Sequence, residues 1–89
     1  MSTLHDKSTA SHSPSMTLDQ LPVGQKGRIE GLKGDNLSKK RLMAMGLVRG
    51  KEIALEIKAP LGDPRIYTLL GYRLSIRNDD ARNVLISSI

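Results

Sequence analysis

Side chains that could carry out acid–base or metal chemistry are few and widely spaced in this sequence. The two histidines, His5 and His12, lie seven residues apart, which is not the spacing that lets two side chains on one helix share a metal ion. Three carboxylates fall in predicted turns, where capping of backbone amides accounts for them: Asp63, Asp79 and Asp80. No histidine follows residue 12, so the rest of the chain has no imidazole to act as a general base or ligand.

The sequence also lacks the motifs that bind nucleotides or hold metals through sulfur. It has no Gly-x-x-x-x-Gly-Lys-Ser/Thr phosphate loop, and it has no cysteine for a disulfide or a thiolate site. A hard or borderline cation needs several converging side chains, and the acidic residues here are scattered. We therefore expect no enzyme active site, no cofactor, no small-molecule substrate and no high-affinity metal site.

The formal charge of +5 is the feature that points to a partner. Asp6 and Lys7 cancel one another, so the basic excess lies in the remainder of the chain. A basic small domain binds nucleic acid, anionic lipid or an acidic protein, or it simply has a cationic surface in water. Nucleic-acid binding rests on charge alone, because Tyr67 and Tyr72 are the only tyrosines and there is no Phe or Trp. We expect both rings to cover the edge of the fold and both hydroxyls to reach water.

Two regions of different composition divide the chain. Residues 1–15 are rich in Ser, Thr and His and have almost no large apolar side chain, so we expect a disordered tail there. Residues 16–89 form the predicted folded domain. The sequence has no run of about 18 apolar residues that would span a membrane. The N-terminus also lacks the apolar segment of a secretory signal, so we expect a cytoplasmic protein.

Alternating apolar residues and regularly spaced turn signals predict a mainly β fold. The alternation is clearest where Ile53, Leu55 and Ile57 would share the inner face of one strand. Four further strands are predicted at 25–32, 65–70, 72–77 and 84–89, and a helix is predicted at 37–45 between the first two strands. Five short strands and one short α-helix predict a small, strongly bent barrel.

The predicted helix at 37–45 carries both a core contact and a basic surface. Leu42 and Met45 are expected to be buried, with Leu37 near the start of the helix. Three cations occupy its first turns, where the positive end of the helix dipole disfavours them: Lys39, Lys40 and Arg41. They form either a solvated face, where salt screening makes the cost small, or a docking patch for an acidic or phosphate-bearing partner.

Five residues are predicted to face a partner protein. Leu61 lies at the tip of a predicted turn over 59–62, where it either folds back on the core or is offered to a partner. The junction between the helix and the next strand contributes a methionine and an arginine beside the basic helix start. The predicted partner-facing residues are therefore Lys39, Lys40, Met43, Arg49 and Leu61.

Four motifs follow one another along the folded part of the sequence. They are Leu18-x-x-Leu21-x-x-Gly24-x-x-Gly27, Arg41-Leu42-Met43-Ala44-Met45-Gly46-Leu47-x-x-Gly50-x-x-Ile53, Ala59-Pro60-Leu61-Gly62-Asp63-Pro64 and Gly71-Tyr72-x-Leu74-Ser75-Ile76-Arg77. In this order they resemble the FeoA family, small cytoplasmic proteins of bacterial ferrous-iron uptake, over residues 16–89. The resemblance implies an SH3-like barrel. The N-terminal extension departs from the usual short start of the family, so no role for His5 or His12 follows from it.

What the resemblance implies for function is an accessory role. FeoA-family proteins associate with FeoB, a membrane iron permease with a cytoplasmic GTP-binding domain. We therefore expect a protein-binding module that acts on that domain and meets the membrane only through the transporter. The motifs define no catalytic or ligand residues. A basic nucleic-acid-associated barrel and a direct metal-binding regulator are the alternatives, and a free strand edge leaves pairing with a second copy open.

Overall fold

The computed structural model describes residues 16–89 of the chain, and the predicted tail with its two histidines lies outside that range. In chain order the elements are the strand β1 (Met16–Thr17), the 3-10 helix η1 (Leu18–Gln20), β2 (Lys26–Leu32), α2 (Asn36–Ala44), β3 (Glu52–Lys58), β4 (Arg65–Leu69), β5 (Tyr72–Ile76), α3 (Asn78–Ala81) and β6 (Val84–Ser88). Within this range no helix has the length and apolar character needed to cross a membrane.

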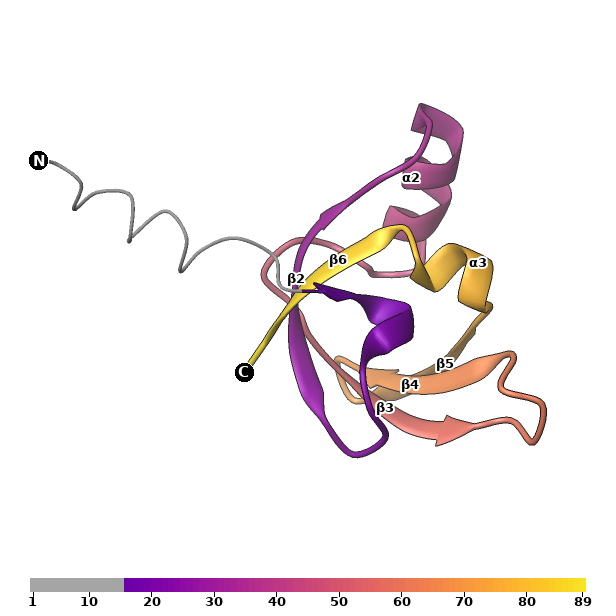
Figure 1. The fold of residues 1–89 in the computed structure, drawn as a ribbon. Coiled ribbons are helices and arrows are strands. Elements are labelled where there is room, and N and C mark those ends of the chain that lie inside the picture. The colour runs from indigo at the N-terminus through magenta and orange to yellow at the C-terminus, as the bar shows by residue number, and fades with distance from the viewer. Residues whose placement is uncertain (1–15) are drawn as a thin grey trace, which may run out of the picture.

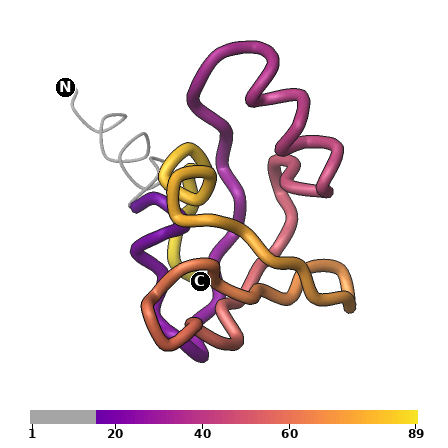
Figure 2. Tube along the Cα trace, turned by 90° about the vertical axis from the view of Figure 1, so that its right-hand side faces the viewer, coloured from indigo at the N-terminus to yellow at the C-terminus, as the bar shows by residue number. Residues whose placement is uncertain are grey.

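The strands of the described domain join one antiparallel sheet in the order β1-β6-β2-β3-β4-β5. The sheet bends strongly, with β3, β4 and β5 in the lower part of the view and β6 above them (Figure 1). The turned view shows α2 at the top and the loop between β3 and β4 near the bottom (Figure 2). The predicted mainly β fold, with one short α-helix between the first two long strands, is confirmed.

The sheet has one strand more than the five predicted. β1 contains only Met16 and Thr17, which pair with Ile86 and Leu85 of β6. Two residues are too few to show an alternating pattern, so the sequence gives no local signal for this strand. It exists because β6, from the far end of the chain, offers it a partner.

Two bulges decide which side chains face inward. The register shifts between Ile29 and Gly31 in β2, and a glycine within a strand is a common site of such a bulge. A second shift between Leu55 and Ile57 in β3 was not predicted. Ile53 and Leu55 are buried as expected, but Ile57 is 47% exposed, so its predicted inward position is wrong. The extra residue at this bulge moves Ile57 off the inner face.

The core is apolar throughout and is built by residues from almost every element. Its members are Leu18, Leu21, Ile29, Leu42, Leu47, Ile53, Leu55, Tyr67, Leu69, Ile76, Ala81, Val84 and Ile86. In a chain without Phe or Trp, Tyr67 is the largest of them, and its hydroxyl donates to the carbonyl oxygen of Leu18 at 3.3 Å. The prediction that this hydroxyl reaches water is therefore wrong. Burial raises the pKa of Tyr67 to about 12.

The second tyrosine closes the junction after α2. Tyr72 is 44% exposed, as expected for a ring at the edge, and its hydroxyl donates to the carbonyl oxygen of Met45 at 3.0 Å. The next residue, Gly46, has φ +99°, a conformation that L side chains rarely adopt. A Cβ at Gly46 would lie 2.6 Å from the Tyr72 hydroxyl oxygen, so the turn needs glycine for space as well.

Candidate partner-binding groove

Asp35 is the N-cap residue of α2. The Asp35 carboxylate accepts a hydrogen bond from the backbone N–H of Ser38 at 2.8 Å, and this bond holds the pKa of Asp35 below its usual value. Leu42 is buried, as predicted, whereas Met45, also predicted to be buried, is partly buried against the core. Leu37 is 79% exposed, so its predicted packing is wrong. Leu42 lies five positions after Leu37, so the two side chains point about 140° apart around the helix.

An ion pair fixes α2 against α3. The guanidinium of Arg41 donates to both carboxylate oxygens of Asp80, at 3.0 and 2.9 Å. These hydrogen bonds lower the pKa of Asp80 and raise that of Arg41. Of the three consecutive cations of α2, Arg41 therefore has an acidic partner inside the domain. Lys39 and Lys40 are not part of this ion pair.

A groove lies between α2, the end of β2 and the segment that follows the helix. Its volume is about 220 Å³, and it is lined by Gly31, Leu32, Lys39, Met43, Leu47, Val48 and Arg49. We call this surface the α2 groove. Leu32, Met43, Leu47 and Val48 give it apolar walls, and Lys39 and Arg49 are its two cations. Gly46 allows the chain to turn back, so that Leu47 and Val48 come to lie beside the helix.

Three of the five predicted partner-facing residues meet in the α2 groove: Lys39, Met43 and Arg49. Lys40 is exposed and follows Lys39 on the helix without lining the groove. Leu32 and Val48 were missed as groove residues. The apolar pair at 47 and 48 was visible in the sequence, but only folding shows that β2 and α2 complete the groove around it.

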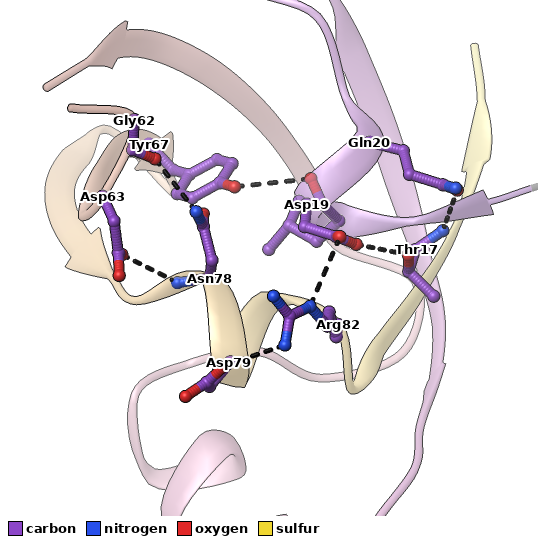
Figure 3. A network of polar contacts seen from close by, with 10 residues as sticks. Thr17, Asp19, Gln20, Gly62, Asp63, Tyr67, Asn78, Asp79 and Arg82 are labelled. Carbon is purple, nitrogen blue, oxygen red and sulfur yellow. Dashed lines mark hydrogen bonds and ion pairs between the residues drawn. The ribbon is translucent and has the colours of Figure 1, made fainter. Parts of the chain in front are cut away.

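Leu61 lies apart from the groove, on the loop between β3 and β4. The loop is at the other end of the molecule from α2 in both views (Figures 1 and 2), and Leu61 is 94% exposed. Asn78 holds the base of the loop. Its backbone N–H donates to the Asp63 carboxylate at 2.9 Å, and its side-chain amide donates to the carbonyl of Gly62 at 3.0 Å (Figure 3). Leu61 is therefore presented outward from a fastened loop.

The remaining carboxylates serve structure. Asp63 accepts a hydrogen bond from the backbone N–H of Asn78 at the start of α3, so its predicted capping role is found. Asp79 pairs with Arg82 at 2.8 Å (Figure 3) and Asp80 pairs with Arg41, so these two carboxylates form ion pairs and not the predicted caps. Arg82 also reaches Asp19 in η1 at 4.0 Å, which joins the two ends of the described domain. Within residues 16–89 no group of three or more His, Cys, Asp or Glu side chains is placed to hold a metal ion.

A second hollow of about 420 Å³ lies over β2, β3 and β4. Its floor includes Ala54, which pairs with Lys26 on one side and Thr68 on the other, so a short side chain lies between longer ones. Lys26 and Lys51 line it and are exposed. It is larger than the α2 groove but is lined by none of the predicted partner-facing residues.

Comparison with known proteins places the fold in a family. The model of the FeoA domain matches residues 16–88, nearly all of the described chain. The chain belongs to the FeoA family. The resemblance in the four sequence motifs is thereby confirmed, and the N-terminal residues 1–15 lie outside the matched range.

The FeoA relatives include solved structures and a fusion protein. The chain has a TM-score of 0.80 and 34% identity to a FeoA-like protein from Clostridium acetobutylicum, covering 86% of this chain and 90% of that one. A FeoA from Stenotrophomonas maltophilia, solved with zinc and described as a prokaryotic SH3 domain protein, has a TM-score of 0.71 and 26% identity over 82% and 91% of the two chains. The predicted SH3-like fold is therefore confirmed.

The fusion protein joins a FeoA-like part to a transporter. It is the Fe(2+) transport protein A/Fe(2+) transporter FeoB fusion protein of Porphyromonas gingivalis, 35% identical to this chain over 74 residues. The match covers 83% of this chain and 9% of the fusion protein. The chain thus corresponds to a small part of that relative.

Proposed function

We propose that this FeoA-family chain is an accessory protein of bacterial ferrous iron uptake that binds the cytoplasmic GTP-binding domain of a FeoB-type transporter. The observation that carries the proposal is the fusion relative, in which a FeoA part and a FeoB part share one polypeptide. Two parts in one chain meet at a high effective concentration, so even a weak contact between them is occupied. A separate chain must make the same contact through a surface of its own.

The α2 groove is the surface that best suits this contact. Protein interfaces combine an apolar centre with a polar rim, and methionine and arginine are enriched in them. The groove has apolar walls that include Met43, and Arg49 and Lys39 supply its charge. Met43 is 46% exposed and has a flexible, polarizable side chain that adapts to the shape of a partner. Lys40 lies next to this surface, while Leu61 would make a separate contact.

We further propose that residues 16–89 are sufficient for binding and that the protein works in the cytoplasm. The α2 groove and Leu61 both lie within residues 16–89, and the family match covers residues 16–88. No part of the proposed contact uses residues 1–15. A chain that starts at Met16 is therefore expected to bind as tightly as the whole chain.

The test is calorimetric titration of the transporter's cytoplasmic domain, taken from the same organism, into the whole chain and into the chain that starts at Met16. We expect saturable binding with equal affinity for both. Absence of binding by the whole chain would contradict the proposal. Binding of duplex DNA instead, with an affinity that falls steeply as salt is raised, would favour the nucleic-acid alternative.

A further inference from the structure

The cations of the α2 groove have no partner within the domain. Ion pairs in residues 16–89 engage Arg28, Arg41, Arg73 and Arg82, and they leave out Lys39, Lys40 and Arg49. The two carboxylates that are bonded to α2 already have partners. Asp35 caps the N-terminus through Ser38, and Asp80 is held by Arg41.

The position of these cations adds to the imbalance. Lys39 and Lys40 lie in the first half of α2, whose first turn has no acidic residue, and there the helix dipole favours negative charge. A negative group placed against this face interacts favourably with both the side chains and the helix end. The groove is therefore complementary in charge to an acidic ligand.

The apolar walls decide what kind of acidic ligand fits. Leu32, Leu47 and Val48 offer no polar side chain to a phosphate or a base edge, and the exposed Tyr72 is not among the groove residues on which a base could stack. A volume of about 220 Å³ accommodates a large apolar side chain such as Leu or Phe. Nucleic acid would use the cations and leave these walls unused, whereas a protein segment would use both.

We infer that the α2 groove binds an acidic segment of the partner that inserts one large apolar side chain between Met43 and Val48 and places carboxylates on Lys39 and Arg49. The inference rests on the proposed function, because it specifies the chemistry of the segment in the transporter's cytoplasmic domain. Methionine at the groove wall suits this role, because its flexible side chain can pack against either a branched aliphatic or an aromatic side chain.

The first experiment changes the charge of the groove. Lys39→Glu together with Arg49→Glu is expected to weaken binding of the transporter's cytoplasmic domain more than tenfold and to reduce the dependence of affinity on salt. The matched control is Lys26→Glu together with Lys51→Glu, which makes the same change in net charge at the second hollow. The control is expected to alter the affinity less than threefold.

The second experiment identifies the segment. With the photo-crosslinking residue p-benzoylphenylalanine placed at Met43, irradiation of the complex and mass spectrometry are expected to find a partner peptide that has at least two carboxylates beside a Leu, Ile, Met or Phe. The same label placed at Leu70, which is exposed and lines the second hollow, is expected to give no such product.

The outcomes separate this inference from the proposed function. If the domain binds the wild type and the Lys39/Arg49 variant equally, or if the crosslinked peptide is neutral or basic, the acidic-segment inference is overturned and the proposed function stands. If the domain does not bind the wild-type chain at all, both fail. Tight binding of a duplex DNA probe that is lost in the Lys39/Arg49 variant also overturns the inference, because the groove cations then serve a phosphate backbone.

Discussion

Arg41 and Asp80 form a two-point contact in which the guanidinium donates hydrogen bonds of 3.0 and 2.9 Å to the two carboxylate oxygens. The contact joins α2 to α3, and the two residues are 39 positions apart in the sequence. It neutralises the third of three consecutive cations and leaves Lys39 and Lys40 to solvent or a partner. The pair thus links α2, which forms one wall of the α2 groove, to α3, and neither residue of the pair lines the groove.

The Arg41–Asp80 pair predicts a dependence of stability on acid pH. The pKa of Asp80 is lowered from 3.8 in the folded state, so the pair contributes stability above about pH 4 and loses it as pH falls through the folded pKa. Asp80→Asn should lower the thermal midpoint by about 2–5 °C at pH 7. The difference from wild type should shrink as the pH falls below about 4, as followed by circular dichroism. A difference that stays constant as the pH falls would show that the loss has another cause.

Tyr67 predicts a second dependence, at alkaline pH. Its folded pKa of about 12 lies above the ordinary 10.0, so the unfolded chain loses the proton first and stability falls as pH rises from about 10 to 12. Tyr67→Phe removes this titration, at a cost of about 1 kcal/mol for the lost hydrogen bond to Leu18. Urea unfolding at pH 9 and pH 11 measures both effects. At pH 11 the unfolding free energy of the variant should therefore approach or exceed that of the wild type. An equal difference in unfolding free energy at pH 9 and pH 11 would contradict the argument.

Gly46 and Gly50 form a matched pair for the junction after α2. Both have positive φ, +99° and +91°, but only at Gly46 would a Cβ meet another atom, the Tyr72 hydroxyl oxygen at 2.6 Å. Gly50→Ala should cost about 1 kcal/mol of unfolding free energy from backbone strain alone. Gly46→Ala should cost about 1–2 kcal/mol more.

The contribution of the Tyr72 clash is measured by a double variant. Tyr72→Phe removes the hydroxyl, so Gly46→Ala should be less costly in that background by the part due to the clash. Denaturant titrations of the four chains give the coupling. Equal costs of Gly46→Ala in both backgrounds would show that backbone strain, and not the close approach to Tyr72, sets the requirement for glycine.

Leu61 predicts an effect on binding without an effect on stability. Because it is 94% exposed, Leu61→Ser should change the unfolding free energy by less than about 0.5 kcal/mol. Leu61 belongs to the loop between β3 and β4 and Met43 to α2, and these two segments lie at opposite ends of the domain (Figures 1 and 2). The losses in affinity from Leu61→Ser and Met43→Ala should therefore add. Calorimetry on the two single variants and the double variant measures this. A strong coupling would mean that one compact epitope reaches both residues.

Much of the fold follows from local signals in the sequence. Asp35 precedes α2 and Gly46 follows it, and both ends of this helix were predicted to within one residue. Helix ends are predictable here because capping and positive φ depend on a few neighbouring residues. The burial of Ile53 and Leu55 likewise followed from an alternating pattern within one strand.

The features that were not predicted depend on contacts between distant segments. Ile57 leaves the inner face at a bulge that no glycine marks, and Tyr67 is buried because the core has no larger side chain to fill that space. The predicted partner-facing residues came from charge and exposure alone. Only the three-dimensional structure shows that Met43 lines a groove with Lys39 and Arg49 and that Leu61 does not.

The most direct test is to measure ferrous iron uptake by cells that lack the gene for this chain and carry either the wild-type chain or a variant of it. Cells with Lys39→Glu and Arg49→Glu should take up labelled ferrous iron no faster than cells without the protein, while cells with Lys26→Glu and Lys51→Glu should match wild type at equal protein levels. Equal uptake by the two variants would contradict the claim that the α2 groove is the functional surface.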